Sequence, residues 1–507
     1  MNRARHLLRS SLIVILLFGL DKLVGLARAL LVSRVFGTNP EFDAFTAANQ
    51  LPEVFVTLIA GGALAAAFIP VYSASLSSPA GKQAARLANT ILTLVLLVLG
   101  SISALGAVFA PWLTRTLLVP DFSPALQQLT SELMRIILLQ TTLFGISGVL
   151  SSILNARQHF VLPALAPLAL QIGYFVGLFL FVPALGIHGL AWGTVVGGLL
   201  HILIQLPALR RFQFRYRPVL GLELASVREV VRLMGPRIAT LGAVQVADLF
   251  IIRLTSGLSP GSTSGYFYGY YLQQLPETLF GTAIAIVVFP TLSELYNGGR
   301  LAEMKQTAMN ALRIVWWLTI PAGAGLVLLG QPAITFLLER GEFDANSTRL
   351  VYSVLVFFSL RVVSEASLEI LARLFYAQHN TRTPMIAALG WLVITVSLSY
   401  LLVGPLGVGG LALASSIAFT AQSLLLFWLN QKRLGSLDER TLALSLGRAL
   451  LATAGMSLVI LALGRVIANQ LIFLVVAGGG GVVTYVLLSY LLGGQEIPQL
   501  RQLLRRS

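Results

Sequence analysis

The chain has 507 residues, of which 56% are hydrophobic and only 11% are charged, and its formal net charge at pH 7 is +15. A soluble domain carries about 25% charged residues, because its water-facing surface needs them. The composition therefore excludes a soluble protein of this length, and the apolar runs that recur along the chain predict membrane-spanning helices of about 20 residues each.

The first apolar run, residues 11–35, follows a basic N-terminus, as the apolar segment of a signal peptide would. It is too long for such a segment, it contains Asp21, Lys22 and Arg28, and no small-residue cleavage pattern closes it. We therefore expect a retained first helix. The chain has no cysteine, which excludes disulfides and thiolate metal sites.

Further apolar runs, separated by glycine, proline and charged residues, extend this pattern to about fourteen spans. The predicted spans are 11–35, 49–75, 86–112, 132–155, 160–183, 187–209, 227–254, 268–294, 307–329, 349–376, 384–403, 408–430, 445–467 and 470–493. The runs are continuous and do not alternate with period two, which disfavours a β-barrel. The expected fold class is an all-α polytopic membrane protein.

The basic residues between the predicted spans indicate the orientation. If the N-terminus is cytoplasmic, most basic residues outside the spans fall on the cytoplasmic side, and the outer segments hold only Arg115, Arg340, Arg349 and Arg465. Cytoplasmic loops of membrane proteins carry such an excess of positive charge. We therefore expect both termini and the loop 210–228 in the cytoplasm, membrane lipids as partners, and no nucleic acid.

Short stretches recur in the two halves of the chain, in the same order, at offsets of 224 and then 220 to 221 residues. The matches are Gln50-Leu51-Pro52-Glu53 with Gln274-Leu275-Pro276-Glu277, Leu117-Leu118 and Phe122 with Leu337-Leu338 and Phe343, Leu162-Pro163 with Thr383-Pro384, and Gly189-Leu190-Ala191 with Gly410-Leu411-Ala412. The offset covers six spans, an even number, so the two halves form a parallel repeat.

Transporters build a central cavity between two such repeats, whereas a duplicated bundle without a transport role is the alternative. We expect an N-terminal lobe of six helices (1–210), a C-terminal lobe of six helices (211–433), and two extra helices with a basic tail (434–507).

Helix 1 carries charged residues inside the membrane. Asp21 and Arg28 fall on one helical face, and Lys22 lies beside it. An ionisable group in hydrocarbon faces a cavity or a charged partner. Pairing of Asp21 with Arg28 or Lys22 would neutralise one cation only, so the surplus positive charge favours a role in ligand binding.

Two later spans also carry charges. Arg237, near the start of span 227–254, is placed either to face the inner mouth of a cavity or to reach the membrane surface. In span 349–376 the spacing of four places Arg361, Glu365, Glu369 and Arg373 on one face. Pairing between residues four apart satisfies all four charges locally, so we expect structural pairs ahead of a proton or ion relay.

Signs of enzyme chemistry are few. The five histidines are scattered, and the sequence shows neither an HExxH motif nor a Walker loop. We expect a transporter without a cofactor or a metal. ATP is then not the direct energy source, and an ion gradient or the membrane potential is the expected one.

Residues 10–430 carry, in order, a series of stretches that resembles the MurJ (MviN) lipid II flippases. The stretches are Gly25-Leu26-Ala27-Arg28, Val35-Phe36-Gly37, Asp43-Ala44-Phe45, Leu51-Pro52, Leu154-Asn155, Pro163-Ala164-Leu165-Ala166-Pro167, Val196-Gly197-Gly198, Gln205-Leu206-Pro207, Phe289-Pro290-Thr291-Leu292-Ser293, Gly341-Glu342-Phe343, Phe375-Tyr376 and Thr383-Pro384. The fourteen-helix plan of that family also agrees with the predicted spans.

The resemblance implies a two-lobed fold of the multidrug/oligosaccharidyl-lipid/polysaccharide exporter superfamily in the bacterial cytoplasmic membrane. It implies transport of the undecaprenyl-diphosphate-linked peptidoglycan precursor (lipid II) from the inner to the outer leaflet, and cell-wall synthesis enzymes as partners. A cationic cavity between helices 1, 2, 7 and 8 would hold the diphosphate. Arg28 and Asp43 match charged positions of that cavity, and Lys22 stands where the family usually has arginine, which loses the bidentate fork.

Other positions depart from the family pattern. The arginine pair that the family carries on helix 2 falls at Val56 and Thr57. The acidic–arginine pair and the following glutamate of helix 8 fall at Tyr270, Tyr271 and Gln274. Asp248 matches one acid of the sodium site that some members have, but residues 384–403 contain no carboxylate. The ion site that the resemblance implies is therefore incomplete.

Three hypotheses remain after these departures. The chain flips lipid II with a rearranged cavity, helped by Arg237, or it flips another lipid-linked oligosaccharide that is less charged or differently capped. The third is a non-transporting membrane partner of cell-envelope synthesis. A diphosphate needs several donors to leave water, and this cavity has lost about three cations. We favour the first hypothesis over the second, and both over the third.

Overall fold

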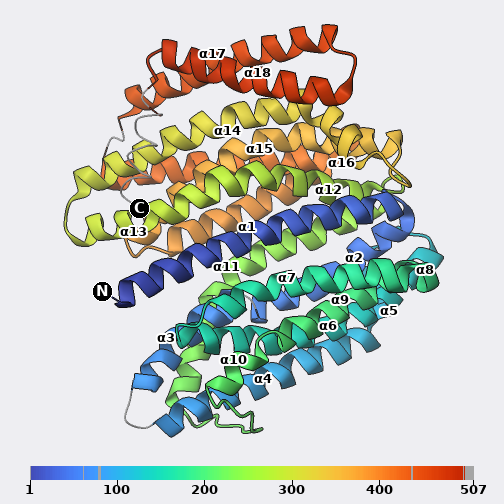
Figure 1. Cartoon of the computed structure of the whole chain (residues 1–507), viewed down its shortest axis with the longest axis vertical. Helices are drawn as coiled ribbons and strands as arrows, with labels where there is room; N and C mark the ends of the chain where they lie inside the picture. Colours follow the sequence, from blue (N-terminus) through green and yellow to red (C-terminus); the bar gives the residue numbers. More distant parts are fainter. Residues whose placement is uncertain (1, 61, 78–80, 436–437, 495, 497–507) are drawn as a thin grey trace. The chain divides into compact units, whose positions relative to one another are not determined.

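The computed structural model describes residues 2–60, 62–77, 81–435, 438–494 and 496. All regular elements among these residues are helical (Figure 1), which agrees with the all-α fold class expected from the continuous apolar runs. The chain forms two compact units, Met1–Thr263 and Ser264–Ser507. The predicted division at residues 210 and 433 concerns the repeat and the added helix pair, and it stays a prediction.

Unit 1 contains the first eleven α-helices and three π-helical turns. They are α1 (Asn2–Phe36), α2 (Pro40–Phe55), η1 (Val56–Ala60), α3 (Gly62–Ser77), α4 (Gly81–Val108), α5 (Ala110–Leu113), η2 (Thr114–Leu118), α6 (Pro124–Ala156), α7 (Val161–Val176), η3 (Gly177–Phe181), α8 (Val182–Leu185), α9 (Ile187–Leu203), α10 (Leu206–Arg211) and α11 (Ala225–Ser256).

Unit 2 begins within the next helix of the chain. Its elements are α12 (Ser262–Pro276), the π-helical turn η4 (Glu277–Thr282), α13 (Ala283–Asn297), α14 (Leu301–Leu338), α15 (Ala345–Ala377), α16 (Arg382–Leu434), α17 (Glu439–Val466) and α18 (Gln470–Leu491). Helices α17 and α18 lie side by side (Figure 1) and pack on α14, where the Trp317 indole N–H donates to the Ser489 hydroxyl at 2.7 Å.

Local sequence explains where several helices begin. Asn39, Ser123 and Asp344 each accept a hydrogen bond from the backbone N–H three residues later, at the first turns of α2, α6 and α15. Such side chains satisfy a backbone donor that the helix itself leaves without a partner. Proline follows at the first helical position in α2 and α6, where its fixed φ suits the helix and no N–H is needed.

The internal repeat extends to backbone conformation. Gly186 has φ 57° and ψ −137°, and Gly407, 221 residues later, has φ 55° and ψ −138°. Three further pairs share a positive φ at offsets between 221 and 224 residues: Gly37 with Gly261, Gln158 with His379, and Gln213 with Gly435. A positive φ is uncommon for residues other than glycine, so its recurrence at Gln158 and His379 supports a duplicated backbone.

Ten helices in the described part of the chain are long and apolar enough to cross a membrane. One of them is α16, which the break at Gly407 divides into the two predicted spans 384–403 and 408–430. The long helices α1, α11 and α15 carry several charged residues and are not among the ten. The count of fourteen crossings stays a prediction.

Close packing of glycines joins α7 and η3 to α9 within unit 1. A Cβ on Gly173 would overlap the backbone of Gly197, and a Cβ on Gly177 would lie 2.7 Å from the Cα of Gly193. Small residues four apart allow helices to approach backbone to backbone, as in membrane helix pairs. Helix α7 also contacts α1, which carries the predicted site residues.

Candidate functional site

Asp21 and Arg28 of α1 contact α7 inside unit 1. Asp21 accepts a hydrogen bond from the Gln171 amide at 3.1 Å, and the Arg28 guanidinium lies 4.3 Å from the centre of the Tyr174 ring. Neither Lys22 nor Arg28 forms a salt bridge with any described residue. The internal pair with Asp21, which was the alternative explanation, is therefore not formed, and both cations keep charge that a ligand can use.

Asp43 lies in the first turn of α2 and is 2% exposed. One of its carboxylate oxygens accepts a hydrogen bond at 2.6 Å from the backbone N–H of Gly261, which follows α11. Gly261 has φ 89°, and a Cβ there would overlap the carbonyl oxygen of Thr38. Asp43 thus ties the α1–α2 turn to the end of α11, and its predicted role towards a substrate stays a prediction.

Helix α11 carries two of the predicted site residues, Arg237 and Asp248. The side chain of Arg237 lies outside the described residues. Asp248 is half-buried. No group of three or more His, Cys, Asp or Glu side chains among the described residues is arranged to hold a metal ion. The ion site at Asp248 stays a prediction.

The charges of α15 form two ion pairs, as the spacing of four predicted. Arg361 donates from Nε and Nη2 to the two carboxylate oxygens of Glu365, both at 2.9 Å, and from Nη1 to the Ser415 hydroxyl at 3.0 Å. Arg373 pairs with Glu369 one turn further along. The first pair is the more enclosed, with Arg361 and Glu365 side chains 8% and 13% exposed against 18% and 34% for Arg373 and Glu369.

Three aromatic rings surround the Arg361 guanidinium. It lies 4.0 Å from the ring centre of Phe419, 5.1 Å from that of Tyr270 and 5.6 Å from that of Phe358. Aromatic faces attract a cation, and the attraction grows when the site is dry. Tyr270 and Tyr271 stand where the resemblance implied an acidic residue and an arginine on the eighth helix of the family plan. In this chain the positive charge beside Tyr270 comes from Arg361 of α15.

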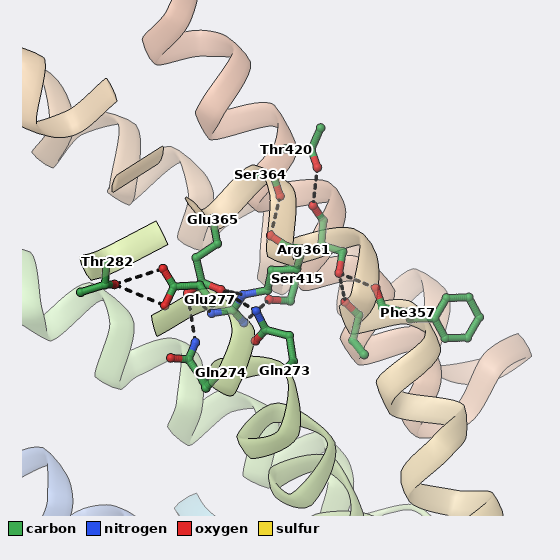
Figure 2. A network of polar contacts seen from close by, with 12 residues as sticks. Gln273, Gln274, Glu277, Thr282, Phe357, Arg361, Ser364, Glu365, Ser415 and Thr420 are labelled. Carbon is green, nitrogen blue, oxygen red and sulfur yellow. Dashed lines mark hydrogen bonds and ion pairs between the residues drawn. The ribbon is translucent and has the colours of Figure 1, made fainter. Parts of the chain in front are cut away.

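Three residues from the end of α12 and the start of η4 complete this cluster (Figure 2). Gln273 and Gln274 donate from their amide groups to the two oxygens of Glu365, at 3.0 and 3.3 Å. Glu277 is 3% exposed and accepts from the Thr282 hydroxyl at 3.1 Å. Sequence reasoning missed Gln273 and Glu277 as members of a site, although both lie in or beside the repeated Gln274-Leu275-Pro276-Glu277 motif.

Asp344 and His159 are among the titratable groups outside the apolar spans whose pKa values are shifted. The backbone N–H of Ser347, aided by the side chains of Ser347 and Asn346, lowers the pKa of Asp344 at the start of α15. Burial, followed by the charge of Arg211, lowers the pKa of His159 in the turn before α7. Both groups belong to turns between helices, so these shifts report on local structure and not on a catalytic centre.

Residues 32–477 match the protein family described as "Lipid II flippase MurJ". The chain belongs to the MurJ family. A probable lipid II flippase MurJ from Bdellovibrio bacteriovorus is 31% identical over 492 residues, covering 95% of this chain and 94% of the relative. The lipid II flippase MurJ from Burkholderia cenocepacia is 30% identical over 424 residues, covering 82% of each chain.

Solved structures show the same fold. A lipid II flippase MurJ in an inward closed conformation superposes with a TM-score of 0.80 at 23% identity, covering 95% of this chain and 98% of that one. An inward-facing multidrug resistance MATE transporter of the MOP superfamily has a TM-score of 0.70 at 16% identity, covering 83% and 96%. The expected family, the polytopic helical fold and the multi-pass inner-membrane location are confirmed.

Proposed function

We propose that this MurJ family member flips lipid II from the inner to the outer leaflet by alternating access. Relatives named as lipid II flippases match 95% and 82% of this chain. The observation that carries the proposal is the pair of cations on α1, Lys22 and Arg28, which form no salt bridge with any described residue. A diphosphate must exchange its water for several charged donors, and these two side chains supply them.

Within this proposal Arg28 and Lys22 of α1 make the main contacts with the diphosphate. Arg28 can present two N–H groups to neighbouring phosphate oxygens, whereas Lys22 acts as a point charge. Asp43 fixes the turn after α1 through the Gly261 amide and thereby the exit of that helix. Arg237 of α11 is the third cation of this proposal. An ion gradient or the membrane potential drives the cycle, and cell-wall synthesis enzymes supply and consume the lipid.

Both termini are cytoplasmic in this proposal, because the basic residues then fall mainly on the inner side. The chain has no cysteine, so single-cysteine labelling is free of background. A cysteine at Arg215, in the loop before α11, should resist an impermeant thiol reagent added to intact cells and should react after the membrane is opened. Labelling in intact cells contradicts the orientation.

A second candidate is a flippase for another lipid-linked oligosaccharide. The observation in its favour is the loss of cations on the second and eighth helices of the family plan. Val56 and Thr57 of η1 replace the arginine pair of the second helix, and Tyr271 of α12 replaces the arginine of the eighth. Arg361, the cation beside Tyr270, is already neutralised by Glu365. A less charged or differently capped headgroup would need fewer donors than the diphosphate of lipid II.

Complementation separates the candidates. The chain is expressed in a strain depleted of its own lipid II flippase, and outer-leaflet lipid II is measured with an impermeant reagent. Rescue of growth together with outer-leaflet lipid II supports the proposal, and Arg28→Ala is the variant expected to lose both. Normal protein levels in the membrane with neither rescue nor outer-leaflet lipid II contradict it and favour the second candidate.

A further inference from the structure

The cluster around Glu365 in unit 2 holds more negative than positive charge. Arg361 and Arg373 each pair with one glutamate, Glu365 and Glu369 respectively. Glu277 is a third buried carboxylate, and the charges that act on it are those of Glu365, Glu369 and Arg361. With all five groups ionised the cluster carries one net negative charge in a region enclosed by apolar helices, where an uncompensated charge is costly.

The hydrogen-bond inventory of the cluster is also incomplete. The guanidinium of Arg361, both glutamine amide groups and the Thr282 hydroxyl all donate to partners within it. The Oε1 atom of Gln273 accepts no hydrogen bond from any residue that the structure describes, although Gln273 is 0% exposed. Buried acceptors nearly always have a donor, so the cluster lacks one proton donor as well as one positive charge.

We propose that Glu277 is a proton-binding site of unit 2, which takes up one proton and releases it again during the transport cycle. Binding forms an O–H bond on the Glu277 carboxylate and brings the cluster from one net negative charge to neutrality. The neutral acid can donate to an acceptor such as Gln273 Oε1, one helical turn earlier on the same segment. Release returns the proton to water and restores the carboxylate. This proposal rests on the proposed function for its coupling to transport.

The position of Glu277 gives such a proton a mechanical effect. Glu277 opens the π-helical turn η4, an element that often marks functional sites in α-helices. A Cβ on Gly281 would lie 2.7 Å from Glu277 Oε1 and 2.7 Å from the Cβ of Ala366, so the carboxylate lies where η4 and α15 touch. Loss of its charge removes the repulsion from the α15 glutamates at this contact, which favours closer packing of η4 on α15.

The charged residues that the structure describes on the neighbouring helices α12, α13, α14 and α16 are few, and they lie near helix ends or in other ion pairs. Helix α12 contributes no charged residue, and α13 contributes only Glu294, which is exposed near Arg300. On α14 the charged residues are Glu303 and Lys305 near its start and Arg313, which pairs with Glu496 at 2.9 Å. The charged residues of α16 lie near its two ends.

A proton fits the cluster better than a metal ion does. Among the described residues no group of three or more acidic or histidine side chains converges as metal ligands would. The guanidinium of Arg361 already occupies both oxygens of Glu365, and two glutamine amide groups approach the same oxygens with donors. One excess charge and one unmatched acceptor are both corrected by a single proton.

Infrared spectroscopy of the purified full-length protein in lipid tests the site directly. Glutamate carrying a ¹³C carboxyl group shifts both the acid and the carboxylate bands, and the acid band is followed as pH is varied. We expect a protonated buried glutamate in the wild type that is absent in Glu277→Gln and present in the matched control Glu294→Gln. If Glu277→Gln does not fold, Glu277→Asp should move the band and keep its titration.

The same preparation tests coupling to transport. With one proton moved inward for each lipid moved outward, a difference of one pH unit, acid outside, should raise the ratio of outer- to inner-leaflet lipid II by about tenfold. Glu277→Gln should abolish this dependence, and Glu294→Gln should retain it. Absence of the acid band at every pH, a band that responds to Na⁺ instead of pH, or equal pH dependence in wild type and Glu277→Gln each overturns the proposal. An intact band without any lipid II movement refutes the proposed function and leaves the proton site standing.

Discussion

Reversing the two ion pairs of α15 should have unequal effects, although the pairs lie on the same helix with the same spacing. The double variant Arg361→Glu/Glu365→Arg is expected to remain destabilised, whereas Glu369→Arg/Arg373→Glu should behave nearly as the wild type. The reason is that the first pair is fixed by its neighbours. Aromatic rings surround the cation at 361, and the amides of Gln273 and Gln274 donate to the anion at 365.

The expected magnitudes follow from burial and contacts. The single change Arg361→Glu places two carboxylates side by side and leaves Glu365 without its partner, which costs about 3–5 kcal/mol in a buried pair. Restoring the opposite charge at 365 recovers the ion pair but leaves a carboxylate against the ring faces. The cation–π attraction that is lost amounts to about 2 kcal/mol in a desolvated site. The outer pair, half-exposed at Glu369, couples by roughly 1 kcal/mol or less.

Unfolding of the purified variants in detergent, followed by tryptophan fluorescence, measures these differences, and the amount of folded protein in membranes serves as a second readout. Each double variant is compared with its two single variants as a double-mutant cycle. Full recovery of the wild-type midpoint by the Arg361→Glu/Glu365→Arg variant would show that the rings and glutamines contribute nothing. The inference that the neighbouring residues require the cation at 361 and the anion at 365 would then be wrong.

Three further predictions concern other parts of the chain. The double variant Lys22→Ala/Arg28→Ala should fold normally but lose flipping. Its affinity for the diphosphate should fall at least thirtyfold, because a lost buried charge partner costs about 2–5 kcal/mol. Transport at the wild-type rate would refute this. Gly173→Ala should lower the unfolding free energy by about 1–3 kcal/mol, because its methyl group overlaps the α9 backbone, whereas Gly100→Ala, which meets nothing within 4 Å, should not. Asp344→Ala should cost about 1 kcal/mol at neutral pH, and because the native pKa of Asp344 is lowered this difference should fade as pH falls below about 4 in unfolding curves.

Much of the fold follows from local sequence. Continuous apolar runs predict the helices, because a membrane span needs its backbone hydrogen bonds satisfied within the segment. The break at Gly407 follows from the glycine and proline residues around it, and the pairs on α15 follow from the spacing of four on one helix. These features depend on residues that are close in sequence, so they can be predicted from a single amino-acid sequence.

The partners that sequence reasoning missed are far apart along the chain. Asp43 meets the amide of Gly261 across 218 residues, and the amide is a backbone group that any residue would supply. Gln273 and Glu365 are separated by 92 residues, and nothing in either helix indicates the other. Helical periodicity shows which face of a helix is polar, but it does not show which helix that face meets.

The charge cluster of unit 2 illustrates why cations should be counted by cluster rather than by helix. Judged on α12 alone, Tyr270 and Tyr271 replace the acidic–arginine pair of the family pattern. In the folded chain the Tyr270 ring contacts Arg361 of α15, so positive charge is present beside the replaced pair but is held by Glu365. The exchange changes the chemistry, because a paired and caged guanidinium cannot leave its anion for a phosphate at low cost. The α12–α15 cluster is therefore better suited to holding a proton balance around Glu277 than to binding the diphosphate, which leaves the α1 cations as the stronger candidates for the lipid.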